Sequence, residues 1–545
     1  MQQPASGTRT RARRRSLGAV SLAVCLAACG LAAAWSPVAE GSEVAGSATE
    51  PRHHSHHSHG APATSGGGAL AAAAGVPSPG SWQLGVKVER VVHTFDLPGT
   101  DDEILLCAGS GNSVAWATER KFVCYRYDRD AGTYTTFRTP TDWFCNAAVH
   151  MHDGKLLVAS GTAIGGYPQQ NGGRWGGTAE SYTYAPTTGA VTRIGNVIPA
   201  WYPGLLEDQD GGIYKHGGIH NGSAVKAWEY LPRGETSWRR VAWAYTTQTY
   251  SDIRLIGPKL AAYTGASSGP NANRLPAVLD LATGRRTTTP GLRLPGSRKS
   301  AASVLLFPAQ EERVLVIGGV KTGESAIPYV DEIDYSVWPQ QVPSFVSRSS
   351  LPQGTTLLLA TLLPNGQLFV TGGTATWRQG PIRWAAIYDP DEDEWIRVAS
   401  PTINRNYHSA IMTDLDGRVS TFGGNPSAKV FEDDEEIYSP WYVDRPRPVL
   451  GSAPSAMSYG SSHQVDVTLP PGATLGYFTL DRARADTHVY VPNQTMVDLP
   501  FTTDAGGNVT VQVPSDRALL PPGYYKLAAN TTDAVPSRQV WVRIG

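Results

Sequence analysis

The chain has 545 residues, a net charge of -1 at pH 7 and an isoelectric point near 6.9. Its 46 basic and 47 acidic residues leave no charge excess that would draw it to nucleic acid or an anionic membrane surface. Gly (58), Pro (40), Trp (15) and Tyr (23) are abundant, which is typical of a turn-rich all-β protein and excludes a predominantly helical or disordered chain. The length is sufficient for at least two domains.

The first 35 residues resemble an export signal. Four arginines between Arg11 and Arg15 precede an apolar stretch from Leu17 to Trp35. Within it, Leu26–Gly30 resembles a bacterial lipobox, which would place a lipid anchor on Cys29, and Arg14–Leu17 resembles a twin-arginine signal. An ordinary cleaved signal and an uncleaved anchor are the alternatives. Each of them predicts an exported protein, extracellular or at the cell surface, whose only membrane contact is its N-terminus.

Residues 36–84 are predicted to form a disordered linker, because Gly, Ser, Ala and Pro dominate and apolar periodicity is weak. The linker contains five histidines between His53 and His59. Imidazoles on a flexible backbone bind Cu²⁺, Ni²⁺ or Zn²⁺ weakly. A solvated segment without a role explains the same composition equally well.

The rest of the chain has three cysteines, Cys107, Cys124 and Cys145. An odd number of cysteines in an exported protein calls for an explanation. Cys107 and Cys124 lie in consecutive strand-like runs, so a disulfide across neighbouring strands is plausible. Cys145 then stays single, either as a small buried hydrophobic residue or as a partner in a bond to something other than sulfur.

Residues 85–444 repeat one pattern, in which a strand-like run ends in one or two glycines. It returns after roughly fifty residues, the period of kelch repeats. The runs end in Leu105–Gly109, Leu157–Gly161, Tyr214–Gly218, Ala262–Gly265, Leu315–Gly319, Phe369–Gly373 and Ser420–Gly424. Asp-Gly or Asn-Gly dipeptides precede several of them and suit tight hairpin turns. We expect an all-β fold with a seven-bladed kelch-type β-propeller, and six blades as the alternative because the first and fourth units are the weakest.

Residues 445–545 show a different pattern. Short alternating strands such as Gln464–Thr468 and Val509–Val513 are separated by turns rich in Pro and Gly. This pattern predicts an immunoglobulin-like β-sandwich of about a hundred residues. Fold alone assigns no function, because propellers and sandwiches serve many.

Four separated motifs carry a functional signal. They are Trp143-Phe144-Cys145, Glu229-Tyr230-Leu231-Pro232, Tyr407-His408-Ser409 and Thr487-His488. In this order, on a propeller followed by a sandwich, they resemble the galactose oxidase and glyoxal oxidase family of mononuclear copper radical oxidases. The resemblance covers roughly residues 85–545, and Trp201-Tyr202-Pro203 also fits the family's pattern.

The resemblance implies a role for each residue. Cys145 would form a thioether with the ring of Tyr230, and this cross-linked phenolate would bind copper and store a radical. Tyr407 would be a second phenolate and the catalytic base, and His408 and His488 would supply imidazole nitrogens. Two other tyrosines, Tyr184 and Tyr202, compete with Tyr230 for the cross-link.

The chemistry of these residue types supports a copper site independently. Cu²⁺ accepts one electron, whereas oxidation of an alcohol to an aldehyde removes two, so a second redox group must lie beside the metal. A phenol can hold that second equivalent, and a sulfur substituent lowers its potential. Imidazole and phenolate ligands suit Cu²⁺ better than Zn²⁺ or Ca²⁺. A free tyrosine has a pKa of about 10, so binding to a cation is what would make it a phenolate.

One departure from the family concerns a tryptophan that shields the thioether. The stretch Thr249–Arg254 has no tryptophan, so either Tyr250 takes this place or a tryptophan comes from another loop. No clear match exists to the residues that bind galactose. We therefore expect a monomeric oxidase of a small aldehyde or primary alcohol that reduces O2 to H2O2, with a link to cell-surface glycan assembly. The alternative is an inactive propeller that binds a glycan or a protein.

Overall fold

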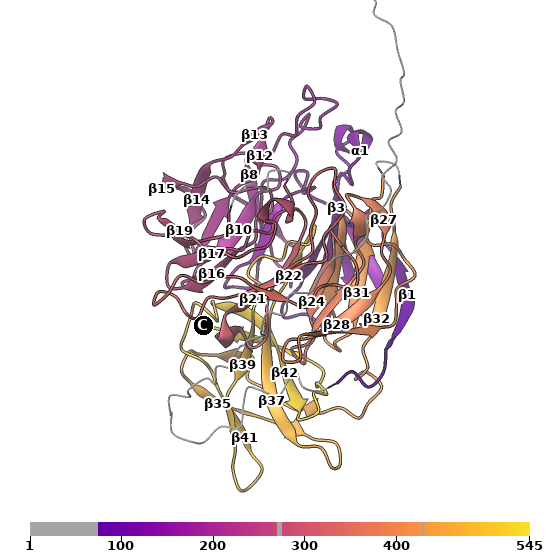
Figure 1. Ribbon diagram of the computed structural model, residues 1–545, viewed down its shortest axis with the longest axis vertical. Coiled ribbons are helices and arrows are strands. Elements are labelled where there is room, and N and C mark those ends of the chain that lie inside the picture. The colour runs from indigo at the N-terminus through magenta and orange to yellow at the C-terminus, as the bar shows by residue number, and fades with distance from the viewer. Residues whose placement is uncertain (1–74, 270–274, 428–429) are drawn as a thin grey trace, which may run out of the picture. The chain divides into compact units, whose positions relative to one another are not determined.

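The computed structural model describes residues 75–269, 275–427 and 430–545, all within the compact unit Thr64–Gly545. These residues form 43 β-strands, two 3₁₀ turns and one short helix, α1 (Val114–Thr118) (Figure 1). The predicted all-β class is confirmed. None of the described helices has the length and hydropathy needed to cross a membrane. The predicted signal, Cys29 and the run His53–His59 lie outside the described residues.

Seven antiparallel sheets follow one another along the described chain (Figure 1). The first sheet contains β2 (His93–Asp96), β3 (Glu103–Gly109), β4 (Val123–Asp128) and β5 (Thr133–Arg138), and the second contains β6 (Ala147–His150), β7 (Leu156–Ala159), β8 (Glu180–Tyr184) and β9 (Val191–Asn196). The third sheet contains β10 (Gly204–Glu207), β11 (Ile213–His216), β14 (Ala227–Leu231) and β15 (Arg239–Ala244). The fourth sheet contains β16 (Ile253–Gly257), β17 (Leu260–Tyr263), β18 (Ala277–Asp280) and β19 (Arg286–Thr288).

The remaining three sheets have the same order of strands. The fifth sheet contains β20 (Ala302–Leu305), β21 (Arg313–Ile317), β22 (Val330–Asp334) and β23 (Val346–Arg348). The sixth sheet contains β24 (Leu359–Leu362), β25 (Leu368–Thr371), β28 (Ala385–Asp389) and β29 (Glu394–Val398). The seventh sheet contains β30 (Ser409–Thr413), β31 (Val419–Gly423), β32 (Asp434–Ser439) and β1 (Ser81–Lys87). Two small hairpins, β12 (Ile219–His220) with β13 (Ser223–Ala224) and β26 (Thr374–Thr376) with β27 (Gln379–Pro381), extend from the third and sixth sheets.

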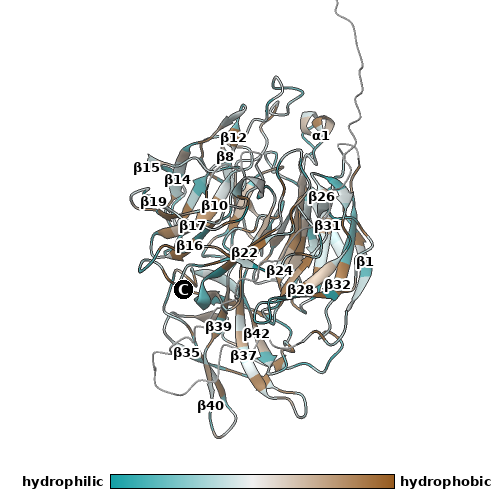
Figure 2. Cartoon of the chain, in the orientation of Figure 1, coloured by the Kyte–Doolittle hydropathy of each residue, from teal (hydrophilic) through white to brown (hydrophobic). Residues whose placement is uncertain are grey.

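Each predicted glycine-ended run forms or follows the second strand of a different sheet, from β3 to β31. The first strands of neighbouring sheets lie side by side, as β6 does with β10 and β24 with β30, and β30 also contacts β2. First strands such as β6 are wholly buried, whereas fourth strands such as β5 are mostly exposed. This gradient explains why the first and second strands read as apolar runs. The third strand of the sixth sheet, β28, is also buried, and Figure 2 shows brown segments there.

The N-terminal strand of the fold begins earlier than the sequence predicted. The expected linker extended to residue 84, but β1 starts at Ser81 and pairs with β32, Ser81 opposite Ser439. Trp82 lies in this strand, and its ring is 5.2 Å from that of Tyr438. Packing of the half-buried Trp82 ring on the buried Tyr438 ring explains why this segment pairs as a strand despite its Gly- and Pro-rich surroundings.

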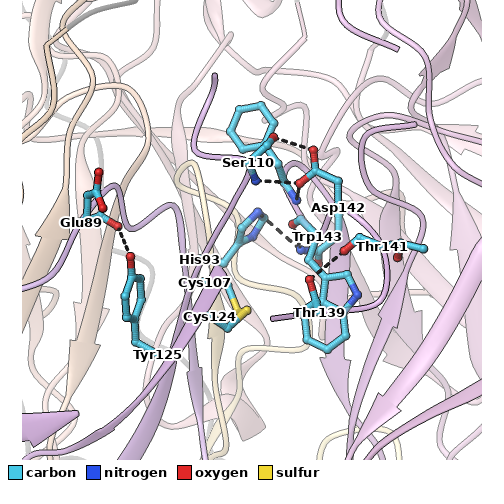
Figure 3. Close-up of a disulfide and its surroundings, with 12 residues drawn as sticks. Glu89, His93, Cys107, Ser110, Cys124, Tyr125, Thr139, Thr141, Asp142 and Trp143 are labelled. Atoms are coloured by element: carbon cyan, nitrogen blue, oxygen red, sulfur yellow. Dashed lines mark hydrogen bonds between the residues drawn. A yellow bond between two sulfur atoms is a disulfide. The ribbon is translucent and has the colours of Figure 1, made fainter. Parts of the chain in front are cut away.

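The predicted disulfide between Cys107 and Cys124 is present, and Cys145 is the one free cysteine among the described residues. Cys107 and Cys124 face each other across β3 and β4. On the other side of β3, His93 pairs with Cys107. The ring nitrogen Nε2 of His93 accepts the backbone N–H of Cys145 at 3.2 Å. Figure 3 shows this disulfide with His93 beside it, and the disulfide therefore braces the strands that hold the Cys145 turn.

After residue 445 the strands form a second set of sheets. The larger sheet contains β34 (Ala456–Met457), β43 (Val540–Ile544), β42 (Gly523–Thr531), β37 (Leu475–Arg482) and β39 (Met496–Leu499). A second sheet contains β35 (Ser462–Val465), β41 (Val509–Gln512) and β40 (Phe501–Thr503). A third pairs β33 (Val449–Leu450) with β36 (Val467–Thr468). Val511 of one sheet and Phe478 and Leu527 of the other share a single apolar core.

A loop from this second set reaches the first strands of the seven sheets. We call residues 485–494 the hub loop. Its first part, β38 (Ala485–Asp486), pairs with β2. The phenol hydroxyl of Tyr490 accepts a hydrogen bond from the N–H of Leu205 and donates its proton to the carbonyl of the same residue, each at 3.0 Å. The side-chain oxygen of Gln494 accepts the N–H of Leu305 at 2.9 Å. These bonds to three different sheets fix the loop where the first strands meet.

Candidate metal centre

Three loops that lead into first strands bring a thiol, two phenols and an imidazole together. Cys145 precedes β6, Tyr202 precedes β10, and Tyr407 and His408 precede β30. The hub loop adds a second imidazole, that of His488. All are buried except Tyr407, which is half-buried. The N–H of Tyr202 donates to the carbonyl of Cys145 at 3.2 Å, which joins two of these loops directly.

The backbone of these loops has an unusual conformation. Cys145, Tyr202, His408 and His488 have φ values of 60°, 59°, 66° and 54°, the left-handed region that L-residues seldom occupy. Such a residue costs on the order of 1–3 kcal/mol, and it persists only where the surrounding structure imposes it. The turn aims each side chain toward the meeting point of the first strands.

The phenol oxygen of Tyr202 is the centre of the cluster. It lies 2.5 Å from the phenol oxygen of Tyr407, 2.6 Å from Nε2 of His488 and 3.4 Å from Nε2 of His408. The Cys145 sulfur and one nitrogen of each of these histidines lie within 4.8 Å of one another. Cys145 and Tyr202 also belong to one cluster of buried side chains. Five potential ligand or cross-link atoms thus converge.

The tautomer of His488 is fixed by Thr487. The Thr487 hydroxyl donates its single proton to the carbonyl of Val92 at 2.9 Å. Its 2.6 Å contact with Nδ1 of His488 must therefore be donated by the ring, so Nδ1 carries the proton. The lone pair is then on Nε2, the nitrogen that faces Tyr202. This is the arrangement that orients a histidine as a metal ligand.

Burial keeps every group of the cluster neutral at pH 7. It raises the pKa of Tyr202 and Tyr407 well above the usual value, and it lowers that of His408 and His488 well below it. Burial likewise raises the pKa of the Cys145 thiol, which excludes a ready-made thiolate. A divalent cation among these atoms would reverse the penalty for the two phenolates. Two neutral imidazoles and two phenols form a nitrogen and oxygen donor set that fits Cu²⁺.

The structure does not bring Tyr230 to this cluster, so the prediction of Tyr230 as the partner of Cys145 is corrected. Tyr230 lies on β14, the third strand of its sheet, and its hydroxyl donates to Asp208 at 2.9 Å. Tyr184, on the third strand of the preceding sheet, stacks on Phe137 instead. Tyr202, the remaining alternative, lies against Cys145.

The sequence contained a signal for Tyr202. Each glycine-ended strand is preceded by a first strand, and the side chains one or two residues before that first strand reach the centre. Trp201-Tyr202-Pro203 stands in this position, as Cys145 and Tyr407-His408 do. The Glu229–Pro232 motif comes after the glycine-ended strand, so it belongs to an outer strand.

Aromatic rings cover Tyr202, although Thr249–Arg254 has no tryptophan. The Trp201 ring stacks on Tyr202 with centroids 3.8 Å apart and an interplanar angle of 6°. Tyr250 stacks on Tyr202 at 4.4 Å, and Trp175 stacks on Trp201 at 4.4 Å. Of the two expected ways of shielding the ring, Tyr250 does stack on it, whereas the tryptophan on it is the neighbouring Trp201 and the one from another loop, Trp175, stacks only on Trp201.

A cavity of about 810 Å³ opens onto Tyr202 and Tyr407. Its described lining includes three indole rings, those of Trp175, Trp201 and Trp377, and a polar run from Thr246 to Thr249. His408 and His488 are not part of the lining. A molecule in this cavity would therefore meet the two phenols first, which suits a small polar substrate with some apolar surface.

Residues 447–544 match the family model of the galactose oxidase-like early set domain. A galactose oxidase of Gibberella zeae is 22% identical over 409 residues, covering 72% of this chain and 53% of that protein. The aldehyde oxidase GLOX of Vitis pseudoreticulata is 28% identical over 223 residues, 36% of this chain and 42% of that protein. The chain spans about half the length of these curated relatives.

Among solved structures, a fungal alcohol oxidase in complex with copper has a TM-score of 0.73 and 21% identity to this chain, and it covers 86% of this chain and 100% of its own. The fold and the site define an all-β protein with a buried centre of phenol and imidazole groups. These comparisons show that the chain is similar to members of the galactose oxidase and glyoxal oxidase family, the resemblance that the sequence indicated.

Proposed function

We propose that this protein is a copper radical oxidase that converts a primary alcohol or a small aldehyde while it reduces O2 to H2O2. The observation that carries the proposal is the convergence of Cys145, Tyr202, Tyr407, His408 and His488 at one point beside a cavity. For an alcohol the reaction is RCH2OH + O2 → RCHO + H2O2, and a hydrated aldehyde would give the acid.

The ligands would be the phenolates of Tyr202 and Tyr407 and the Nε2 atoms of His408 and His488. Copper, when bound, supplies a one-electron redox couple. The second electron is taken up by the Tyr202 side chain, which is buried and stacked between aromatic rings that exclude water. Copper and Tyr202 would each accept one electron, and together they would accept the two electrons that the alcohol loses.

Tyr407 has the position of a proton acceptor. It is half-buried and lines the cavity, and its phenol oxygen lies 2.5 Å from that of Tyr202. As a phenolate it would accept the hydroxyl proton of the substrate and hold it at the phenol oxygen. Its neighbour Arg378, whose guanidinium carbon is 4.6 Å from the centroid of the Tyr407 ring, would stabilise the negative form.

Cys145 and Tyr202 would be joined by a thioether. The thiol loses its hydrogen and the tyrosine ring loses one hydrogen, and O2 takes up the two electrons and two protons as H2O2. The 3.2 Å backbone hydrogen bond between the two residues and their membership of one buried cluster support this pairing. The stored radical would then lie on the cross-linked Tyr202 ring.

The architecture belongs to the same proposal. Seven consecutive antiparallel sheets, first strands that lie side by side and the contact of β30 with β2 support a closed seven-bladed propeller of the kelch type. The sheets after residue 445 and the match of residues 447–544 support an immunoglobulin-like sandwich. The N-terminal sequence supports export, with a lipid anchor on Cys29, and action on or near cell-surface glycans.

A binding module without catalytic activity is the second candidate, because kelch propellers serve as scaffolds. The assay that separates the two is peroxide formation by copper-loaded protein with glycolaldehyde or methylglyoxal. The oxidase predicts peroxide from the wild-type protein and almost none from Cys145→Ser, whereas Tyr230→Phe, altered on an outer strand, retains full activity. If the copper-loaded wild-type protein forms no peroxide with each of the small alcohols and aldehydes tested, the oxidase is rejected.

A further inference from the structure

We propose that the substrate carries a carboxylate and that Lys299 binds it in the cavity beside Tyr407. The inference rests on the proposed oxidase for its reaction, but the binding step that it predicts is independent of catalysis. The substrate class is then a primary alcohol or aldehyde with an acidic group, such as a hydroxy acid or a sugar acid. The cation–π contact and the charge of the cavity carry the argument.

Lys299 occupies a position equivalent to that of Tyr407. Tyr407 directly precedes His408, whose positive φ marks the turn into β30. Lys299 directly precedes Ser300, whose φ of 51° marks the same turn into β20. The repeat that directs the Tyr407 phenol toward the centre therefore directs the Lys299 ammonium there as well, and both residues line the cavity.

The ammonium of Lys299 has no anionic partner among the described residues. The residue is only 7% exposed, and its Nζ lies 3.5 Å from the centroid of the Trp377 ring. None of the ion pairs or hydrogen bonds between described residues involves Nζ. Burial lowers its pKa to about 8, so the ammonium form still predominates at pH 7. A buried unpaired charge is costly unless a ligand compensates it.

The cavity as a whole favours an anion. A second cation, Arg286, lies in the lining, with its guanidinium carbon 5.4 Å from the centroid of the Tyr245 ring. None of the described lining residues is acidic. Hydroxyls and an amide from the run Thr246–Thr249 could bind the hydroxyl groups of a sugar acid.

The spacing suits a short substrate. Trp377 contacts both groups, because its ring centroid is 5.2 Å from that of Tyr407 and 3.5 Å from Nζ of Lys299. A carboxylate on Lys299 would therefore leave a hydroxymethyl group a few bonds away near the phenol oxygens of Tyr407 and Tyr202. Charge-assisted hydrogen bonds are the strong ones, so Lys299 would select acidic substrates over neutral ones of equal size.

The test compares glycerate with its neutral methyl ester at constant ionic strength. Calorimetric titration of the copper-free protein should show tighter binding of glycerate than of the ester. Lys299→Met should weaken glycerate binding by about 10- to 100-fold, the effect of a lost charged hydrogen bond. Lys299→Arg should retain most of the affinity, and the ester should bind all three proteins alike. Near-UV circular dichroism and Tm check that the variants fold.

Turnover supplies the second readout. In the copper-loaded enzyme, Lys299→Met should reduce kcat/KM for glycerate by a similar factor, through KM, and leave the ester unchanged. Equal binding of glycerate and ester by the wild-type protein, or equal glycerate binding by the wild type and Lys299→Met, would overturn the inference. Binding through Lys299 without any peroxide formation would uphold the inference and reject the oxidase.

Discussion

The loops before β6, β10 and β30 and those before β20 and β24 have one backbone conformation but different side chains. The first set places Cys145, Tyr202 and His408 at the positive-φ position, and the second set places Ser300 and Leu357 there, with φ of 51° and 59°. The left-handed turn is therefore a property of the repeat rather than of the chemistry. One side of the centre is a candidate metal site because of the side chains that occupy the turn there.

The largest expected effect comes from removing a ligand. His488→Ala should reduce copper affinity by more than about 100-fold and abolish peroxide formation, because changes to groups that merely orient a ligand already cost 10- to 100-fold. Competitive titration of Cu²⁺ against a chelator measures the affinity. His463→Ala, on β35, is the matched control and should retain wild-type affinity. Equal copper affinity of the two variants would contradict the assigned ligands.

A smaller loss of copper affinity should follow from removal of the hydrogen bond that orients the His488 ring. Thr487→Val keeps the shape of the side chain but removes the acceptor for Nδ1–H. Copper affinity should fall by about 10- to 100-fold, with Nε2 still available as a ligand. Thr487→Ser should restore most of it, since the hydroxyl is retained. If the Thr487→Val variant binds copper as tightly as the wild-type protein, Thr487 does not set the tautomer of His488.

Copper affinity should rise with pH. The raised pKa values of Tyr202 and Tyr407 mean that both phenols are protonated at neutral pH, so metal binding expels two protons, whereas the lowered pKa values of the histidines mean that they release none. The logarithm of the association constant should therefore rise by about two for each pH unit between pH 6 and 8. Tyr407→Phe should reduce this slope by one, and an unchanged slope would remove Tyr407 from the ligand set.

The smallest effect tests the repeat itself. Ser300 has a positive φ and a buried hydroxyl without a hydrogen-bond partner, so Ser300→Gly should stabilise the fold by up to about 1 kcal/mol. Ser300→Ala removes only the hydroxyl and should gain less. Thermal unfolding measures both. Destabilisation by glycine relative to alanine would show that the turn is not strained.

Much of the site could be predicted from the sequence. Cys145, Tyr407, His408 and His488 stand in recognisable motifs, and the glycine-ended runs marked all seven sheets. The prediction of Tyr230 was wrong because it ignored strand order: Tyr230 comes after the glycine-ended second strand and lies on the third strand, β14. The aromatic cover of Tyr202 was not located because it comes from Trp201, its own neighbour in the chain. The pairing of Ser81–Lys87 with β32 was hidden by a separation of some 350 residues.

Peptide mapping of protein exposed to copper and air tests the central claim most directly. The account predicts that the protein loses two hydrogens and that one digestion product joins the peptides containing Cys145 and Tyr202. The linkage should be absent from Tyr202→Phe and present in Tyr230→Phe. An unlinked Cys145 after complete copper loading, or a link to Tyr230, would contradict it.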